Sequence, residues 1–292
     1  MSTALNGAVA KQDPGREYVL TDKQFSLIAT LVRSEAGINL TEAKRDLVYS
    51  RLVKRLRRLQ VPDFGAYIEY VGSASGNEER RELISAITTN VTNFFREPHH
   101  FEHLGGAVMP VLAERLKRGE SVRMWSAGCS DGREPYTIAC TVLQAFPEAA
   151  RYNLKILASD LDHNSLEKAK EGRYSAEMVS RMPPAIRDRY FKRVGDSGEA
   201  SQQLRDLIAF RFLNLLNDWP FKQKFDVIFC RNVLIYFEQD LQAQIFSRFC
   251  SVLKPGGHLY IGHSERVSGP AMKDLRQIGI TSYRHEPTGG IK

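Results

Sequence analysis

Strand-like and helix-like segments alternate along the chain from residue 121 onward. Apolar runs typical of strands lie at 122–129, 153–162, 225–232 and 257–263, with amphipathic helical segments at 134–146, 163–172 and 239–254. Such alternation indicates βαβ units, in which helices cover both faces of a parallel sheet. Ligands of these sheets bind beyond the carboxyl ends of the strands. We therefore expect an α/β domain over 121–292 with a mostly parallel, doubly wound sheet.

The alternation breaks between Gly172 and Leu215. This stretch has a helical pattern followed by short strand-like runs around a turn rich in Gly, Ser and Asp. We predict a small β subdomain around 173–212, inserted into the sheet domain. The last strand of the main sheet is expected within 280–286.

Residues 18–90 show helical periodicity without a strand pattern. The first helix should begin at a Thr21 or Asp22 cap and end near Gly37. We expect a small all-α N-terminal domain over 18–90, followed by a linking helix region over 91–120. Residues 1–17 lack the basic and apolar regions of a signal peptide and are expected to form a disordered tail.

Composition narrows the class of protein. A chain of 292 residues with 42% hydrophobic and 26% charged residues is long enough for two globular domains. No apolar run approaches the roughly 18 residues that a membrane span needs. The four cysteines form no C-x-x-C pair, which favours reduced thiols over zinc or a disulfide framework. We expect a cytoplasmic monomer without direct membrane insertion.

The stretch WSAGCSDGREPY, residues 125–136, joins the first strand to a helix through small residues, as in nucleotide-binding loops. It lacks the P-loop pattern, and Gly128 and Gly132 do not have the dinucleotide-binding spacing. Both of those sites place phosphate at a helix N-terminus, where Glu134 would repel it. A ligand with a ribose and a cationic end, such as S-adenosylmethionine, fits better. Asp160, after the second strand, could accept both ribose hydroxyls.

Each of these two acids also has an ordinary structural explanation. Glu134 could simply compensate the helix dipole, and Asp160 could cap the next helix. The combination with LKPGGHLYIG, residues 253–262, resembles a class I methyltransferase.

Five segments in order make the resemblance more specific. They are TTNVTNFFREPHHF (88–101), WSAGCSDGREPY (125–136), ASDLD (158–162), FCRNVLIYF (229–237) and GHSE (262–265). Together they resemble the CheR family of chemotaxis receptor methyltransferases, over about residues 20–286. The resemblance implies methyl transfer from S-adenosylmethionine to receptor glutamates, giving glutamyl methyl esters and S-adenosylhomocysteine. It implies no metal, and a partner in the cytoplasmic helical domain of methyl-accepting receptors.

The resemblance also implies roles for particular residues. It places the cofactor between the helical domain and the sheet domain, at Asn90, Thr92, Arg96, Glu134, Asp160, Asn214, Leu215, Cys230, Arg231 and Asn232. We expect Arg96 to orient a carboxylate and the Tyr236 hydroxyl to lie near the methyl group. The alternatives are a surface ion pair of Arg96 with Glu97 or Glu102, and a core position for Tyr236. The glycine loop departs from the commonest family form, which has Thr and Glu where this chain has Asp131 and Arg133.

Residues 44–59 form a basic amphipathic segment. Val48, Leu52, Leu56 and Leu59 share one helical face, and the adjoining stripe consists of Lys44, Arg51, Lys54, Arg55 and Arg58. Because receptor methylation regions are rich in glutamate, we expect this stripe to bind the receptor. A solvated face and an RNA-binding face are the alternatives. The turn in GDSGEASQQ is short, so we expect no tether to a receptor's C-terminal peptide.

Two other functions remain open at this point. The net charge of +7 favours a nucleic-acid methyltransferase. However, the motif order opposes it, and DWPF (218–221) precedes a strand instead of following it as the DNA methyltransferase tetrad does. A non-catalytic module that senses S-adenosylmethionine is the third possibility. His99 and His103, with Glu102 between them, lack a clear third zinc ligand, so we expect no metal site there.

Overall fold

The computed structural model describes residues 16–88 and 91–288. The chain divides into two compact units, Met1–Thr89 and Asn90–Lys292. Of the expected N-terminal tail, 1–17, residues 1–15 lie outside the described residues. Within the described parts of the chain, no helix is long and apolar enough to cross a membrane.

The first unit is helical throughout its described residues. Its helices are α1 Asp22–Ala36, α2 Arg45–Leu59, α3 Phe64–Gly72 and α4 Asn77–Ile87, with short 3₁₀ turns at Glu42–Lys44 and Ala74–Gly76. Thr21 caps α1 in a reciprocal capping box with Gln24, and Gly37 ends the helix in a left-handed conformation. Both predicted ends of the first helix are thus confirmed.

The second unit is built on a seven-stranded sheet in the order β6-β2-β1-β7-β8-β10-β9. The strands are β1 Val122–Ala127, β2 Leu154–Asp160, β6 Ile208–Phe212, β7 Phe225–Cys230, β8 Leu253–Ile261, β9 Leu275–Gly279 and β10 Ser282–His285. The first five pair in parallel, whereas β10 runs antiparallel to β8 and β9. The predicted mostly parallel α/β sheet is confirmed.

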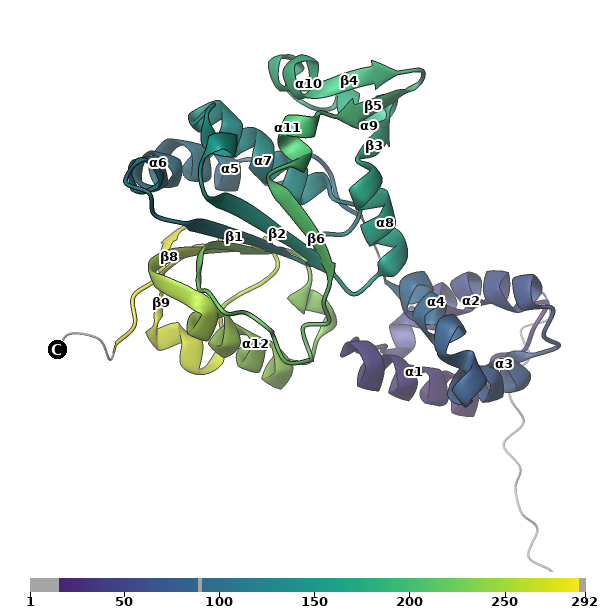
Figure 1. The fold of residues 1–292 in the computed structure, drawn as a ribbon. Helices are drawn as coiled ribbons and strands as arrows, with labels where there is room; N and C mark the ends of the chain where they lie inside the picture. The colour runs from purple at the N-terminus through teal and green to yellow at the C-terminus, as the bar shows by residue number, and fades with distance from the viewer. Residues whose placement is uncertain (1–15, 89–90, 289–292) are drawn as a thin grey trace, which may run out of the picture. The chain divides into compact units, whose positions relative to one another are not determined.

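Helices cover both faces of this sheet (Figure 1). They are α5 His99–His103, a π-helical turn at Leu104–Val108, α6 Met109–Lys117, α7 Arg133–Ala145, α8 His163–Glu171 and α12 Gln239–Val252, with 3₁₀ turns at Ala149–Arg151, Leu234–Tyr236 and Gly269–Lys273. Along β1, Met124 packs with α6 and α7, while the next residue, Trp125, packs with α12. This alternation follows from strand geometry and explains why the central strands are mostly apolar on both faces.

Residues 99–117 belong to the second unit and do not form a separate linking region as expected. Met109, Leu112 and Leu116 of α6 are buried in the same core as Val122 and Met124. The apolar stripe of α6 explains this placement, because it is buried only when the helix packs on the sheet.

The predicted insertion is a three-stranded antiparallel sheet in the order β3-β5-β4. It contains β3 Arg173–Ser175, β4 Phe191–Val194 and β5 Ser197–Ala200, together with α9 Ala176–Ser180, α10 Pro184–Tyr190 and α11 Gln202–Arg205. The expected boundary at residue 212 was wrong, because β6 pairs in parallel with β2 in the main sheet. As an edge strand, β6 is partly exposed, and its largely apolar sequence does not by itself show which of the two sheets it joins.

Candidate active site

The ends of three neighbouring parallel strands bring the predicted cofactor-binding acids to one edge of the sheet. Asp160 is the last residue of β2, Cys230 is the last residue of β7, and Ala127 ends β1 between them. This is the carboxyl edge, where ligands of doubly wound sheets bind.

The glycine loop after β1 is shaped by its backbone. Gly128 has a φ of 79°, and a Cβ there would lie 2.4 Å from Val233 Cγ2, so only glycine fits. The amides of Gly128 and Cys129 donate to the carbonyl of Ser159 at 2.8 and 2.9 Å. The loop is therefore fastened to the end of β2.

Asp160 is buried beneath this loop. Its carboxylate accepts hydrogen bonds from the amide of Ser130 at 2.7 Å and from the amide of Asp162 at 2.9 Å. Burial raises the pKa of Asp160 to about 6, although these amides favour the ionised form. Asp162, and not Asp160, caps the following helix by accepting from Asn164, so helix capping does not explain Asp160.

Glu134 belongs to a buried charge network. It lies in the first turn of α7, which begins at Arg133 after Gly132. Its carboxylate accepts from Ser126 Oγ at 2.7 Å and pairs with Arg231 Nη1 at 3.1 Å. Burial raises the pKa of Glu134 despite the guanidinium of Arg231. Compensation of the α7 dipole is thus not the only interaction that Glu134 makes.

Arg231 joins three segments that are distant in sequence. Its side chain, only 2% exposed, contacts Glu134, lies 3.5 Å from Glu97 Oε2, and donates to the carbonyl of Arg96. Burial disfavours ionised Glu97, but Arg231 and His263 outweigh it and lower its pKa. Two carboxylates thus share one buried guanidinium, which leaves an excess of negative charge suited to a cationic ligand.

Arg96 lies beside this network through its backbone. Arg96 is half-buried as a residue, and its guanidinium donates to the carbonyl of Val91 at 3.0 Å. Within residues 91–288, no ion pair joins Arg96 to Glu97 or Glu102, so the alternative explanation of Arg96 is not supported. Thr92 is half-buried in the same segment, and Asn90 lies outside the described residues.

The loop after β7 carries two predicted residues. Asn232 adopts a left-handed conformation with a φ of 59°, and its backbone N–H donates to the Glu265 carboxylate at 3.0 Å. Tyr236 ends the 3₁₀ turn Leu234–Tyr236, half-buried against the core. Its ring thus serves the core while part of the side chain stays accessible. Glu265, in the GHSE segment, was not predicted to have a role.

The remaining predicted cofactor residues differ in accessibility. Asn214 is half-buried, and its Oδ1 accepts from the amide of Leu216 at 3.0 Å. Leu215 and Cys230 are buried in the core with Trp125, and burial raises the pKa of the Cys230 thiol. Only the backbone of Cys230 could therefore contact a ligand at the strand end.

The two unusual residues of the glycine loop neutralise each other. Arg133 Nη2 lies 2.8 Å from Asp131 Oδ2, and Arg133 Nε donates to the same carboxylate at 3.0 Å. The Asp131 carbonyl also accepts from the Tyr174 hydroxyl. The departure from the family pattern thus introduces an internal ion pair and little net charge.

Strained backbone conformations gather in the same motifs. Across the described part of the chain, six non-glycine residues have positive φ, and four of them are Phe95, Glu97, Ser130 and Asn232. Such conformations persist where the surrounding structure over-determines them, which is common at functional sites.

The histidines near this network have different partners. His103 Nδ1 lies 2.7 Å from the Tyr260 hydroxyl, whereas ligand atoms of Glu97, His99 and His100 lie within 4.8 Å of one another. The carboxylate of Glu97 is already engaged by Arg231 at 3.5 Å and by His263 Nδ1 at 3.1 Å. We therefore propose no metal at this cluster.

The basic stripe of α2 is smaller than expected. Arg51 donates to the carbonyls of Ala86, Ile87 and Thr88, and thereby caps the end of α4. Arg55, 12% exposed, pairs with Glu79 at 2.5 Å and with Glu82 at 2.8 Å. These two residues hold the helical unit together, so the expectation that both contact a receptor needs correction. Lys54 and Arg58 are exposed, and Lys44 is half-buried.

Comparison with known proteins agrees with this geometry. The family model described as the CheR methyltransferase all-alpha domain matches residues 23–88, and the CheR methyltransferase SAM binding domain matches residues 90–284. A probable chemotaxis protein methyltransferase from Rhizobium etli is 50% identical over 263 residues, covering 89% of this chain and 98% of that protein. The chemotaxis protein methyltransferases of Salmonella typhimurium and Escherichia coli are 42% and 43% identical, covering 92% and 85% of this chain and 92% and 86% of theirs. The chain therefore belongs to the CheR family of chemotaxis protein methyltransferases, which use S-adenosylmethionine to methylate receptor glutamates.

Proposed function

We propose that the carboxyl edge of the sheet binds S-adenosylmethionine through Glu134 and Asp160 and transfers its methyl group with the help of Arg96 and Tyr236. The observation that carries this proposal is the buried network in which two carboxylates, those of Glu134 and Glu97, share the guanidinium of Arg231. Glu134 would bind the cationic amino group of the cofactor, and Asp160 its ribose hydroxyls.

The residues present fit such a ligand. Two buried polar atoms, Ser130 Oγ and Asn232 Oδ1, have no hydrogen-bond partner within the described residues. Buried polar atoms are normally satisfied, so these two leave hydrogen-bonding capacity for a polar ligand at the strand ends. Thr92, Asn214, Leu215 and the backbone around Cys230 complete the proposed cofactor residues. Asn90 is included on family resemblance alone.

Methyl transfer to a carboxylate requires little acid–base catalysis from the protein. A glutamate side chain has a reference pKa of about 4.3, so the substrate is already an anion at neutral pH and needs no general base. When bound, the cofactor supplies an activated methyl group on a sulfonium. The task left to the chain is to align the carboxylate and to exclude water. We assign alignment to the Arg96 guanidinium, which can hold a carboxylate with two hydrogen bonds, and to the Tyr236 hydroxyl.

Asp160→Asn should weaken S-adenosylmethionine binding by about 1–3 kcal/mol, because the amide donates where the ribose hydroxyls need an acceptor. The affinity of the unaltered chain should also fall as the pH is lowered through about 6, where Asp160 takes up a proton. Calorimetry between pH 5 and pH 8, with both proteins folded, checks both results. An affinity that is unchanged by the substitution would place the ribose elsewhere.

We also propose that α2 binds the receptor through Lys54 and Arg58, the cations of its stripe that are exposed. Reversing both to Glu should slow receptor methylation at low salt and leave S-adenosylmethionine affinity unchanged. The wild-type rate should fall with salt, because exposed charges are screened over about 8 Å at physiological ionic strength. Lys23→Glu combined with Lys168→Glu, both exposed, is a control with the same change in charge. Equal rates for the two double variants would mean that the exposed cations of α2 are solvated and do not bind the receptor.

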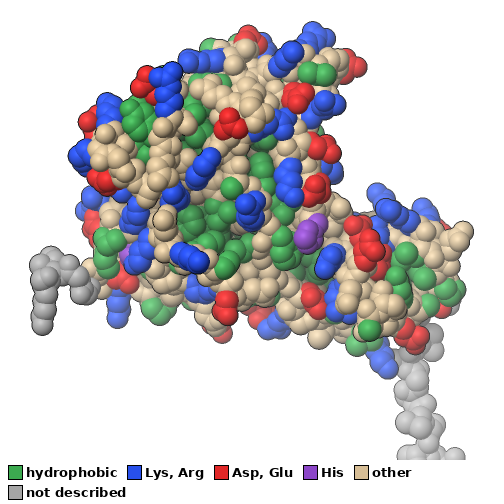
Figure 2. Space-filling view, in the orientation of Figure 1, with side chains coloured by type: hydrophobic (Ala, Val, Ile, Leu, Met, Phe, Trp, Pro, Cys, Tyr) green, Lys and Arg blue, Asp and Glu red, His purple; other side chains and the backbone are tan. Residues whose placement is uncertain are grey.

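The substrate proposed is protein and not nucleic acid. On the face shown in Figure 2, Lys and Arg side chains are interspersed with Asp and Glu in both units and do not form one continuous basic surface. Nucleic-acid interfaces usually have such a surface. We further propose that the protein acts in the cytoplasm as a monomer. Because the turn between β4 and β5 contains only Gly195 and Asp196, we expect no receptor peptide tether there.

A further inference from the structure

Three consecutive backbone amides converge at the end of β7. Those of Asn232, Val233 and Leu234 all point at the Glu265 carboxylate, at 3.0, 2.9 and 2.7 Å. The amide of Gly262 donates to the same carboxylate at 2.5 Å. Successive amides of this kind form an anion-binding concavity, usually called a nest. Here the anion is one of the protein's own side chains.

Glu265 is held by these amides and by no charged partner. It is 3% exposed, and no Lys, Arg or His forms an ion pair with it within residues 91–288. Burial raises the pKa of Glu265, while the four amides oppose the shift. Burying a carboxylate without a cation costs free energy. Here the hydrogen bonds from the four amides offset that cost, and they depend on the conformation of the loop.

The same loop carries the proposed catalytic tyrosine. Asn232 is held with positive φ, and a Cβ on Gly262 would lie 2.4 Å from Asn232 Nδ2, so the two chain segments are in close contact. From Leu234 the chain enters the 3₁₀ turn that ends at Tyr236. The Glu265 carboxylate thus fixes the start of the segment whose end bears the Tyr236 hydroxyl.

We propose that Glu265 is a positioning residue for methyl transfer, which acts by holding the loop 232–236 in its active conformation. This inference rests on the proposed role of Tyr236. Without the carboxylate, the three amides lose their common acceptor, and the turn is free to rotate Tyr236 away from the reacting atoms. A misplacement of about 1 Å can reduce a rate by about 10²-fold.

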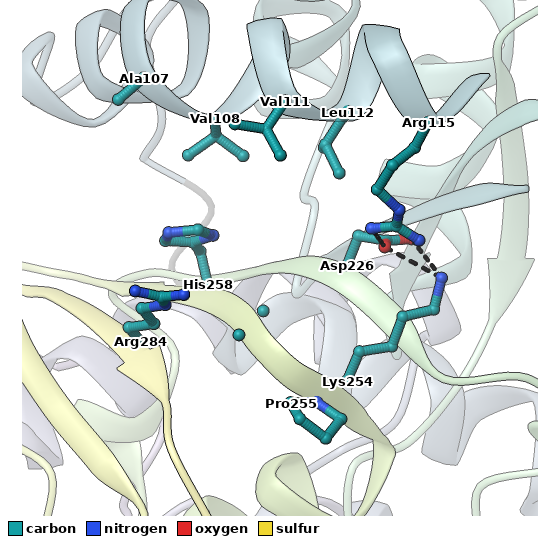
Figure 3. Close-up of a pocket in the computed structure, with 12 residues that line it drawn as sticks. Ala107, Val108, Val111, Leu112, Arg115, Asp226, Lys254, Pro255, His258 and Arg284 are labelled. Carbon is teal, nitrogen blue, oxygen red and sulfur yellow. Dashed lines mark hydrogen bonds and ion pairs between the residues drawn. The ribbon is translucent and has the colours of Figure 1, made fainter. Parts of the chain in front are cut away.

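A matched control is available on β7, the strand that leads into the loop 232–236. Asp226, near the start of β7, is also a buried carboxylate, and it accepts from the amide of Arg123 at 2.8 Å. Figure 3 shows Arg115 and Lys254 directed at it, at 2.6 and 2.9 Å. Asp226 and Lys254 line a pocket near the starts of β7 and β8, at the edge of the sheet opposite to the glycine loop. Replacing Asp226 should therefore destabilise the fold without moving Tyr236.

The test compares Glu265→Ala, Glu265→Asp and Asp226→Asn in the full chain. We measure thermal stability, S-adenosylmethionine affinity, and kcat and KM for receptor methylation at a temperature where all are folded. Glu265→Ala should lower kcat by about 10²-fold, with a smaller change in KM. Asp226→Asn should lower the melting temperature but keep kcat within about twofold. Formate, a small carboxylate, should restore part of the kcat of Glu265→Ala, whereas chloride at equal ionic strength should not.

Two results would overturn the proposal. One is a kcat for folded Glu265→Ala within about twofold of wild type, and the other is a kcat loss that formate does not reverse and that Asp226→Asn shows to the same extent. Tyr236→Phe in the same assay separates this inference from the role of the tyrosine. If Tyr236→Phe is fully active while Glu265→Ala is slow and rescued by formate, the loop matters but the hydroxyl does not.

Discussion

Arg96→Ala should reduce kcat/KM for receptor methylation by about 10²- to 10³-fold, the usual effect of removing one charge-stabilising donor from an active site. The fold should be retained, because Arg96 is not part of the buried core and its guanidinium donates to the carbonyl of Val91. The backbone carbonyl that receives Arg231 is unaffected by the substitution. Methyl-transfer kinetics and a thermal melt of the same preparation check both statements.

Arg96→Lys and Arg118→Ala are the informative comparisons. Lysine keeps the charge but cannot hold a carboxylate with two parallel hydrogen bonds, so Arg96→Lys should stay well below wild type. Arg118, exposed at the end of α6, should tolerate alanine without loss of activity. A folded Arg96→Ala protein with near-normal kcat/KM would show that the segment 88–101 does not form the active site.

Glu134→Gln should weaken S-adenosylmethionine binding by about 10²-fold, equivalent to about 2.7 kcal/mol. The amide keeps the size of the side chain and can still meet Ser126, but it removes the charge that faces a cationic ligand. It also leaves Arg231 paired only with Glu97 and the carbonyl of Arg96. Calorimetric titration with S-adenosylmethionine and with S-adenosylhomocysteine measures the effect.

Asp131→Asn serves as the comparison within the same loop. Its charge is already neutralised by Arg133, so cofactor affinity should change far less than in Glu134→Gln. Equal losses in the two variants would mean that the general negative charge of the loop matters, and not the position of Glu134 beside Arg231. An unchanged affinity in Glu134→Gln would contradict the proposed cofactor orientation.

The central part of the fold follows from local sequence patterns. Strands β1, β2 and β7 are buried on both faces, so their apolar runs stand out, and the helix between Thr21 and Gly37 has recognisable caps. Placing Asp160 at a strand end and Glu134 in the first turn of a helix needed only these patterns. Edge strands β6 and β9 are more exposed, and only the pairing of β6 with β2 shows that its apolar run belongs to the main sheet.

The parts that sequence reasoning missed depend on long-range partners. On a helical projection, Arg51 and Arg55 belong to the same basic stripe as Lys54 and Arg58. Only the contacts of Arg51 and Arg55 with α4 show that these two are not available to a receptor. Arg231 was expected to border the cofactor, but its contacts with Glu97 and Glu134 involve segments far apart in the chain. For Glu265, the signal was its place in a family motif, without an indication of what it binds.

The transfer of labelled methyl groups from S-adenosylmethionine into membranes that contain candidate receptors tests the central claim most directly. Receptors, and not DNA or RNA in parallel reactions, should become labelled. The label should be released by mild base, since a glutamyl methyl ester is base-labile, and it should be absent with Arg96→Ala. Base-stable label, or label in nucleic acid alone, would contradict the account. Binding of S-adenosylmethionine without transfer to any receptor would instead indicate a sensing module.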